Sequence, residues 1–261
     1  MSDAQITRIA LGLEYDGTAF RGWQRQQAGV RTVQQALERI LSRVADHPVQ
    51  VHCAGRTDAG VHAGAQVVHF DTTAERRERS WVLGANANLP KDISVNWARP
   101  VSDDFHARFS ARARRYRYRI INRPVRSALH RLHATWHHWP LDEARMQEAA
   151  RCLLGEHDFT SFRAVGCQAR SPVREITELS VRREGELVSL EIQANAFLHH
   201  MVRNIAGVLM AIGNGEQPVD WAARVLAQRD RSQGGVTAPA QGLLLTGVAY
   251  PAEFGLPGMR T

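Results

Sequence analysis

Cysteine is scarce in this chain of 261 residues, and its three positions, Cys53, Cys152 and Cys167, are far apart. Three such residues cannot all pair and contain no CxxC, so neither a disulfide framework nor a cysteine zinc site is expected. Sparse cysteines are typical of a reducing compartment, and we expect a cytoplasmic protein. The polar start of the sequence has no apolar signal core, which agrees with that expectation.

Long apolar runs and nucleotide-binding glycine motifs are also missing. No stretch approaches the ~18 apolar residues of a membrane span. Neither GxGxxG nor GxxxxGK[ST] occurs, which argues against dinucleotide-binding and P-loop proteins. With 44% hydrophobic and 23% charged residues, the chain has an ordinary globular composition and is long enough for one large domain or two small ones.

Lysine is almost absent, since Lys91 is the only lysine among 33 basic residues, and the formal net charge is +7. The excess charge is concentrated in residues 101–141, which hold nine arginines and two acidic residues. Within this stretch, residues 115–121 alternate Arg and Tyr, which predicts a strand with one strongly basic face. A localised basic segment with interleaved aromatics indicates a polyanionic partner, most plausibly nucleic acid.

Two similar successions of strands and helices fill the chain. Period-two alternation predicts strands at 9–15, 49–53, 66–70, 93–97, 115–121, 173–182, 187–194 and 243–250. Helical periodicity predicts helices at 33–44, 80–87, 141–154, 198–212 and 221–227, the first capped by Thr32 with Gln35 and the second by Ser80. This order predicts an α+β fold of two ferredoxin-like (split βαβ) domains, 1–108 and 109–261. Their sheets are expected to be mainly antiparallel and flanked by helices, with an active-site cleft between the domains.

The densest candidate motif is Gly55-Arg56-Thr57-Asp58-Ala59-Gly60-Val61-His62-Ala63, between two predicted strands. In an extended segment, residues two apart share a face, so Arg56 could pair with Asp58 and keep its carboxylate ionised. Small neighbours would let a ligand approach the backbone. From the residues alone, a surface turn with a solvated ion pair is an equally good interpretation.

This motif resembles the signature of the TruA-type tRNA pseudouridine synthase family. Seven further stretches agree with the family in the same order along the chain: 14–24, 66–70, 105–108, 115–118, 153–159, 197–204 and 238–243. The resemblance implies an enzyme that isomerises uridine to pseudouridine at nucleotides 38, 39 and 40 of the tRNA anticodon stem-loop. It also implies a homodimer that needs no cofactor.

The resemblance further implies roles for individual residues. Asp58 would be the nucleophile, with Arg56 beside it and Arg203 as a second arginine paired with the carboxylate. Tyr116 would stack on the target base, and Leu243 would form an apolar wall of the same pocket. The phosphates would be held by the basic segment, for which we single out Arg112, Arg114 and Arg117.

Other interpretations remain open at the level of the sequence. Attack on the uracil ring and a route through ribose chemistry are both compatible with a carboxylate nucleophile. An RNA-binding protein without catalysis is a second hypothesis. A methyltransferase is a third, although the glycine-rich cofactor loop that it needs is not found. Histidines 133, 137, 138, 199 and 200 lack acidic or cysteine companions at ligand spacing, so no metal site is expected.

Overall fold

The structure is a computed structural model that describes residues 5–257 of the chain. It is an α+β protein with helices and mostly antiparallel strand pairs, as the sequence predicts. The chain forms two compact units: unit 1 comprises Met1–Arg112 with Leu245–Thr261, and unit 2 comprises Ala113–Leu244. Among residues 5–257, no helix has the length and apolar character needed to cross a membrane.

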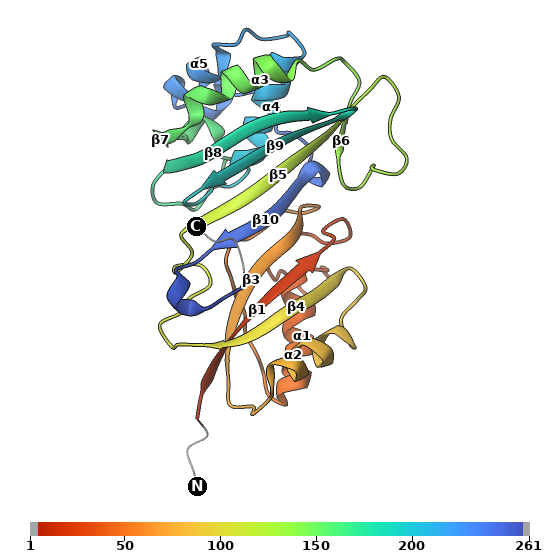
Figure 1. The fold of residues 1–261 in the computed structure, drawn as a ribbon, viewed down its shortest axis with the longest axis vertical. Helices are drawn as coiled ribbons and strands as arrows, with labels where there is room; N and C mark the ends of the chain where they lie inside the picture. Colours follow the sequence, from red (N-terminus) through yellow and green to blue (C-terminus); the bar gives the residue numbers. More distant parts are fainter. Residues whose placement is uncertain (1–4, 258–261) are drawn as a thin grey trace. The chain divides into compact units, whose positions relative to one another are not determined.

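In unit 1, α1 and α2 are interspersed among the strands along the chain (Figure 1). The elements are β1 (Thr7–Tyr15), α1 (Val33–Ala45), β2 (His52–Cys53), β3 (His62–Thr72), α2 (Glu78–Asn86), β4 (Ile93–Val101) and most of β10 (Leu243–Ala249). Strand β1 lies between β4 and β3 and is antiparallel to both, while β2 and β10 also border β3. The strand that carries the residues after the Asp58 motif is therefore held on several sides.

The two helices of unit 1 differ in how their N-termini are capped. Thr32 caps α1 as predicted, because its side-chain oxygen accepts a hydrogen bond from the Gln35 backbone N–H at 3.4 Å. The prediction that Ser80 caps the second helix is wrong. Helix α2 begins at Glu78, and the Ser80 N–H already donates to the carbonyl of the N-cap residue Arg77 at 2.8 Å, which places Ser80 inside the first turn.

Unit 2 has its own sheet and three helices. Its elements are β5 (Ala113–Asn122), β6 (Thr135–His137), α3 (Glu143–Ala150), β7 (Gly155–Asp158), β8 (Val173–Glu184), β9 (Leu187–Ala194), α4 (Met201–Gly213) and α5 (Trp221–Gln228). The antiparallel order is β5-β9-β8-β7, with β6 parallel to β5. Helix α3 packs on β8 and α4 on β5, and the three helices contact one another. Figure 1 shows them clustered beside the strands of unit 2.

The arginine-tyrosine alternation of β5 has the predicted consequence for burial. Tyr116 and Tyr118 are 7% and 0% exposed, whereas Arg117 between them is exposed. One face of β5 therefore enters the core of unit 2, and the other carries positive charge. The two expected domains, 1–108 and 109–261, stay a prediction, since compactness of a unit does not test independent folding.

Candidate active site

The loop that carries Asp58 joins β2 to β3 and is fastened to unit 1 at several points. The Ala54 N–H donates to the Val67 carbonyl at 2.8 Å, and the Val61 N–H donates to the Asp58 carbonyl at 3.1 Å. Gly60 has a φ of +77°, which a residue with a side chain rarely adopts. The loop is thus a defined turn that leaves Asp58 half-buried rather than a mobile surface segment.

A buried glutamine forms hydrogen bonds with the first residues of this loop. Gln66, on β3, is fully buried, and its amide Nε2 donates to the Gly55 carbonyl at 2.7 Å. The same Nε2 lies 3.4 Å from the Tyr15 hydroxyl, which in turn lies 2.8 Å from Thr57 Oγ1. The chain from Gln66 through Tyr15 to Thr57 fixes the residue directly before Asp58.

The segment between β1 and α1 also packs against this loop. The Trp23 N–H donates to the Thr57 carbonyl at 2.9 Å, and the Gly60 N–H donates to the Phe20 carbonyl at 3.3 Å. Gly22, at φ +92°, approaches so closely that an added Cβ would lie 2.9 Å from the Thr57 carbonyl oxygen. This glycine is needed because backbone meets backbone beside Asp58.

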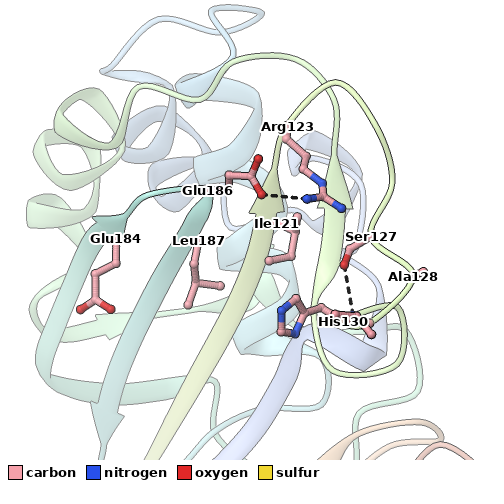
Figure 2. Close-up of a pocket in the computed structure, with 9 residues that line it drawn as sticks. Ile121, Arg123, Ser127, Ala128, His130, Glu184, Glu186 and Leu187 are labelled. Atoms are coloured by element: carbon pink, nitrogen blue, oxygen red, sulfur yellow. Dashed lines mark hydrogen bonds and ion pairs between the residues drawn. The ribbon is translucent and has the colours of Figure 1, made fainter.

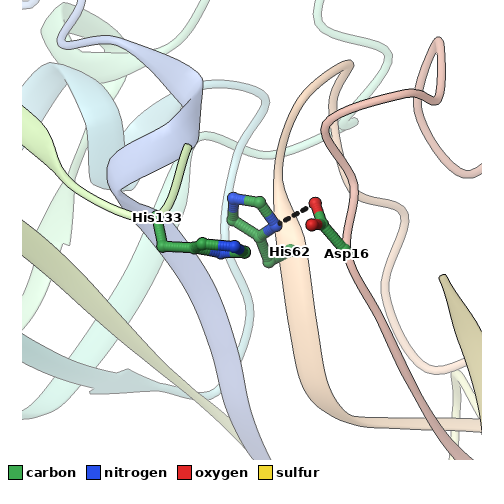
Figure 3. Close-up of side chains that lie close together, drawn as sticks. All are labelled: Asp16, His62 and His133. Carbon is green, nitrogen blue, oxygen red and sulfur yellow. Dashed lines mark ion pairs between the residues drawn. The ribbon is translucent and has the colours of Figure 1, made fainter. Parts of the chain in front are cut away.

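Gly17 makes a second close approach beside a histidine–aspartate pair (Figure 3). A Cβ on Gly17 would lie 2.0 Å from the Val61 carbonyl oxygen. Its N–H donates to His62 Nδ1 at 3.0 Å when that nitrogen carries no proton, whereas a protonated Nδ1 pairs with Asp16 Oδ1, which lies 3.1 Å away. Asp16 and His62 therefore position the far end of the Asp58 loop.

Arg56 lies on the same loop as Asp58 but differs from it in burial. Its side chain is exposed, whereas Asp58 is half-buried, and the ion pairs found among residues 5–257 do not include Arg56. An exposed guanidinium beside a half-buried carboxylate is placed to meet a ligand.

In unit 2, Tyr116 lies on β5 and packs edge-on against Phe197, with ring centroids 5.1 Å apart. Its ring is 7% exposed. Phe197 belongs to the segment between β9 and α4, which ends at His200, a residue with φ +62°. A non-glycine residue with positive φ is strained and is common at functional sites.

Arg203 lies in the first turn of α4 and is bound to the segment before β10. Its Nε donates to the Ala238 carbonyl at 2.8 Å, and the Ala238 N–H donates to the Arg203 carbonyl at 3.1 Å. The next carbonyl, of Pro239, accepts from the buried Tyr118 hydroxyl at 2.8 Å. The residues before Leu243 are thus anchored both to α4 and to β5, and Leu243 itself is 6% exposed.

Tyr118, on the same face of β5 as Tyr116, also belongs to this region. Its hydroxyl lies 2.6 Å from Thr135 Oγ1, and burial raises its pKa above the ordinary value, so it stays protonated. Gly242 packs so tightly there that an added Cβ would lie 2.8 Å from the Tyr118 ring. Gln66 and Tyr15 were likewise present in the motifs, but only the fold reveals that they support the Asp58 loop.

The three arginines expected to hold phosphates differ in their surroundings. Arg112 is exposed and lies at the end of unit 1, while Arg114 is 8% exposed and its Nη1 donates to the Asn195 carbonyl at 2.8 Å. Arg117 is exposed on β5 and pairs with Glu191 of β9 at 2.7 Å. Arg112 and Arg117 are accessible to a large polyanion, and Arg114 is engaged inside unit 2.

A cavity of about 410 Å³ in unit 2 involves none of these residues. Figure 2 shows it between the 123–130 segment and the β8–β9 hairpin, with Arg123 paired to Glu186 at 2.9 Å. Its lining is Ile121, Arg123, Ser127, Ala128, Leu129, His130, Glu184, Glu186 and Leu187.

Taken separately, neither unit brings three metal-ligating side chains together in the described part of the chain.

Comparison with known proteins gives matches over nearly the whole chain. A family model described as tRNA pseudouridine synthase matches residues 13–110 and 149–251. These ranges contain Asp58, Arg56, Arg203 and Leu243, whereas Tyr116 and the three arginines lie between them.

Proteins named tRNA pseudouridine synthase A from several bacteria are similar to this chain. The one from Pseudomonas aeruginosa is 62% identical over 97% of this chain and 89% of its own length. Those from Methylococcus capsulatus and Vibrio cholerae are 63% and 60% identical, over 95% and 97% of this chain and 92% and 95% of their own lengths.

Proposed function

The chain belongs to the tRNA pseudouridine synthase family, and from this premise we propose that it isomerises uridine to pseudouridine at positions 38, 39 and 40 of the tRNA anticodon stem-loop. It is an enzyme of the isomerase class that acts on tRNA. The observation that carries the proposal is the family match across both the Asp58 loop and the segment with Arg203 and Leu243.

Asp58 is the proposed nucleophile. In the reaction the N1–C1′ bond of uridine breaks, the uracil turns, and C5 bonds to C1′ in its place. C5 loses a proton and N1 gains one, so no electrons are transferred and no redox cofactor is required. The half-buried position of Asp58 supports this role, because a nucleophile must be both accessible and held in a fixed orientation. Attack on the ring and the ribose-based route both fit this placement.

The other proposed site residues serve the carboxylate or the base. Arg203 pairs with Asp58 and keeps it ionised, and Arg56 fills the space that the extruded nucleotide leaves. Tyr116 stacks on the uracil, its hydroxyl moves the proton from C5, and Leu243 forms the apolar wall. The hydrogen bonds from Arg203 and Tyr118 to the segment before Leu243 support this role, since they fix the position of the Leu243 side chain.

Arg112, Arg114 and Arg117 are the proposed phosphate contacts. The exposed positions of Arg112 and Arg117 support this assignment most directly. To reach a phosphate, Arg114 would have to leave the Asn195 carbonyl, and Arg117 would have to leave Glu191. We further propose that the enzyme works in the cytoplasm as a homodimer without a metal or cofactor, as the family resemblance implies.

For the fold, we infer that both halves derive from the ferredoxin-like (split βαβ) arrangement. The order β4-β1-β3 with β2 beside β3 supports this in unit 1. In unit 2 the support is that β5, α3, β8, β9 and α4 follow in this order along the chain, with the short strands β6 and β7 between them.

The decisive experiment maps pseudouridine in tRNA from cells that lack this protein. Loss at positions 38, 39 and 40, restored by the wild-type gene but not by Asp58→Asn, is the expected result. Unchanged modification would refute the assigned target. Restoration by Asp58→Asn would instead reject Asp58 as the nucleophile.

A further inference from the structure

Residues 105–110 of unit 1 form a tight turn that presents one aromatic side chain to solvent. Phe109 is 75% exposed. The backbone around it is nevertheless fixed, since the N–H groups of Arg108 and Phe109 donate to His106 Nδ1 at 3.1 and 3.3 Å. Ser110 closes the turn with its N–H on the His106 carbonyl at 2.9 Å. Phe109 is therefore exposed by an ordered turn and not by a loose loop.

A cluster of aromatic rings supports Phe109. Its ring packs on His106 with centroids 4.3 Å apart and planes inclined by 30°. His106 meets His69 edge-on, with centroids 4.6 Å apart and planes inclined by 64°, and His69 is 2% exposed and accepts from the Ala107 N–H at 3.1 Å. His69 in turn stacks on His52 at 5.0 Å. Phe109 extends from this cluster into solvent, where a further flat ring could pack on it.

The surroundings of Phe109 are basic and polar rather than apolar. The Arg108 guanidinium lies 5.6 Å from the centre of its ring. The exposed Arg112 follows three positions after Phe109 in the same unit. A protein partner would favour a broader apolar patch around an aromatic anchor. Unpaired bases of RNA, in contrast, stack on aromatic rings while arginines contact the phosphates.

We propose that Phe109, together with Arg108, is a stacking platform for an unpaired nucleobase of the RNA substrate, outside the reacting uridine. This inference rests on the proposed function, because it takes the bound polyanion to be the tRNA. Its role is in binding: the ring offers a π-face to the base, and packing on His106 in an ordered turn lowers the entropy cost of ordering that ring.

The test compares equilibrium binding of a tRNA transcript with cytidine at positions 38–40, which binds without turnover. Phe109→Ala should weaken binding about 5- to 150-fold, the range expected for the loss of one base–aromatic contact. Phe109→Trp should restore it. Leu83→Ala removes another exposed apolar side chain of unit 1, 54% exposed on α2, and should bind like the wild type.

Salt titration separates stacking from a phosphate contact or a damaged fold. The slope of log K against log salt counts phosphate contacts, so it should be the same for Phe109→Ala and the wild type. Wild-type affinity in Phe109→Ala would overturn the proposal, as would a reduced slope or a loss that Phe109→Trp does not restore. Turnover on uridine-containing tRNA is measured in parallel, so a failure of the proposed enzymatic function shows separately from a failure of the platform.

Discussion

Gln66 offers the most direct test of whether the Asp58 loop depends on a rigid scaffold. The side chain is fully buried, so it cannot touch a bound RNA. Its amide nevertheless serves the Gly55 peptide on both sides: Nε2 donates to the carbonyl at 2.7 Å, and Oε1 accepts from the N–H at 3.4 Å. Gln66→Leu keeps most of the volume and removes both contacts.

The size of the effect follows from the groups left without a partner. Tyr15 keeps Thr57 Oγ1, whereas the Gly55 carbonyl loses its donor, and the Gly55 and Val67 N–H groups lose the Oε1 acceptor. Leaving one such buried group unpaired costs about 1–3 kcal/mol, and we expect the free energy of unfolding to fall by at least this amount. A loop displaced by about 1 Å reduces turnover roughly 10²-fold through misplacement of Asp58. The affinity for tRNA should change little.

The assay combines urea unfolding with single-turnover kinetics on tRNA tritiated at uridine C5, which releases tritium when C5 bonds to C1′. The exposed Gln50→Leu serves as the matched control in the same unit. If Gln66→Leu unfolds and reacts like the wild type, Gln66 does not position the loop, and the reasoning from the Gly55 contacts fails. A loss of affinity equal to the loss of rate would also refute it.

Three further predictions follow from the site and its surroundings. Asp58→Asn should abolish turnover while tRNA binding curves stay nearly unchanged, and a residual rate above about a hundredth of the wild type would reject Asp58 as nucleophile. Tyr116→Phe should bind tRNA normally but react about 10²–10⁴-fold more slowly, and a wild-type single-turnover rate would remove its role in proton transfer. Burial lowers the pKa of His69 from its ordinary 6.5 to about 3, so the unfolded chain binds this proton more readily than the folded one. The contribution of His69 to the free energy of unfolding is therefore largest above pH 6.5. It declines as the pH falls toward 3, by at most ~1.4 kcal/mol per pH unit. Urea unfolding at pH 7.5 and 5 should show this decline in the wild type and less of it in His69→Asn, and equal declines would contradict the assignment.

Long periodic segments made much of the fold predictable from the sequence. Helix α1 with its Thr32 cap and strand β5 with its tyrosine face appear as expected. Strands β6 and β7 were missed because three or four residues are too few to show a period. Helix α4 begins three residues later than predicted, because His200 adopts a left-handed backbone conformation that cannot be predicted from its residue type.

The candidate site was predictable as a set of chemical groups but not as a supported structure. The glycine-rich motif indicated Asp58, yet its support by Gln66 depends on a contact between residues eleven positions apart across a strand boundary. The burial of Arg114 was implicit in the alternation, since it shares the parity of Tyr116 and Tyr118. A basic residue on the core-facing side of a strand is recognised as buried only when a partner such as the Asn195 carbonyl is visible.

The connectivity of the two units bears on how the protein is made. The chain leaves unit 1 at Arg112 and returns to it at Leu245, so unit 2 is an insertion between the parts of unit 1. At synthesis rates of about 5–20 residues per second, residues 113–244 occupy the ribosome for roughly 7–26 s. During that interval β3 lacks its neighbour β10, so the Asp58 loop is attached to an incomplete sheet. The sheet of unit 1 therefore receives its last strand, β10, only after the whole of unit 2 has been synthesised.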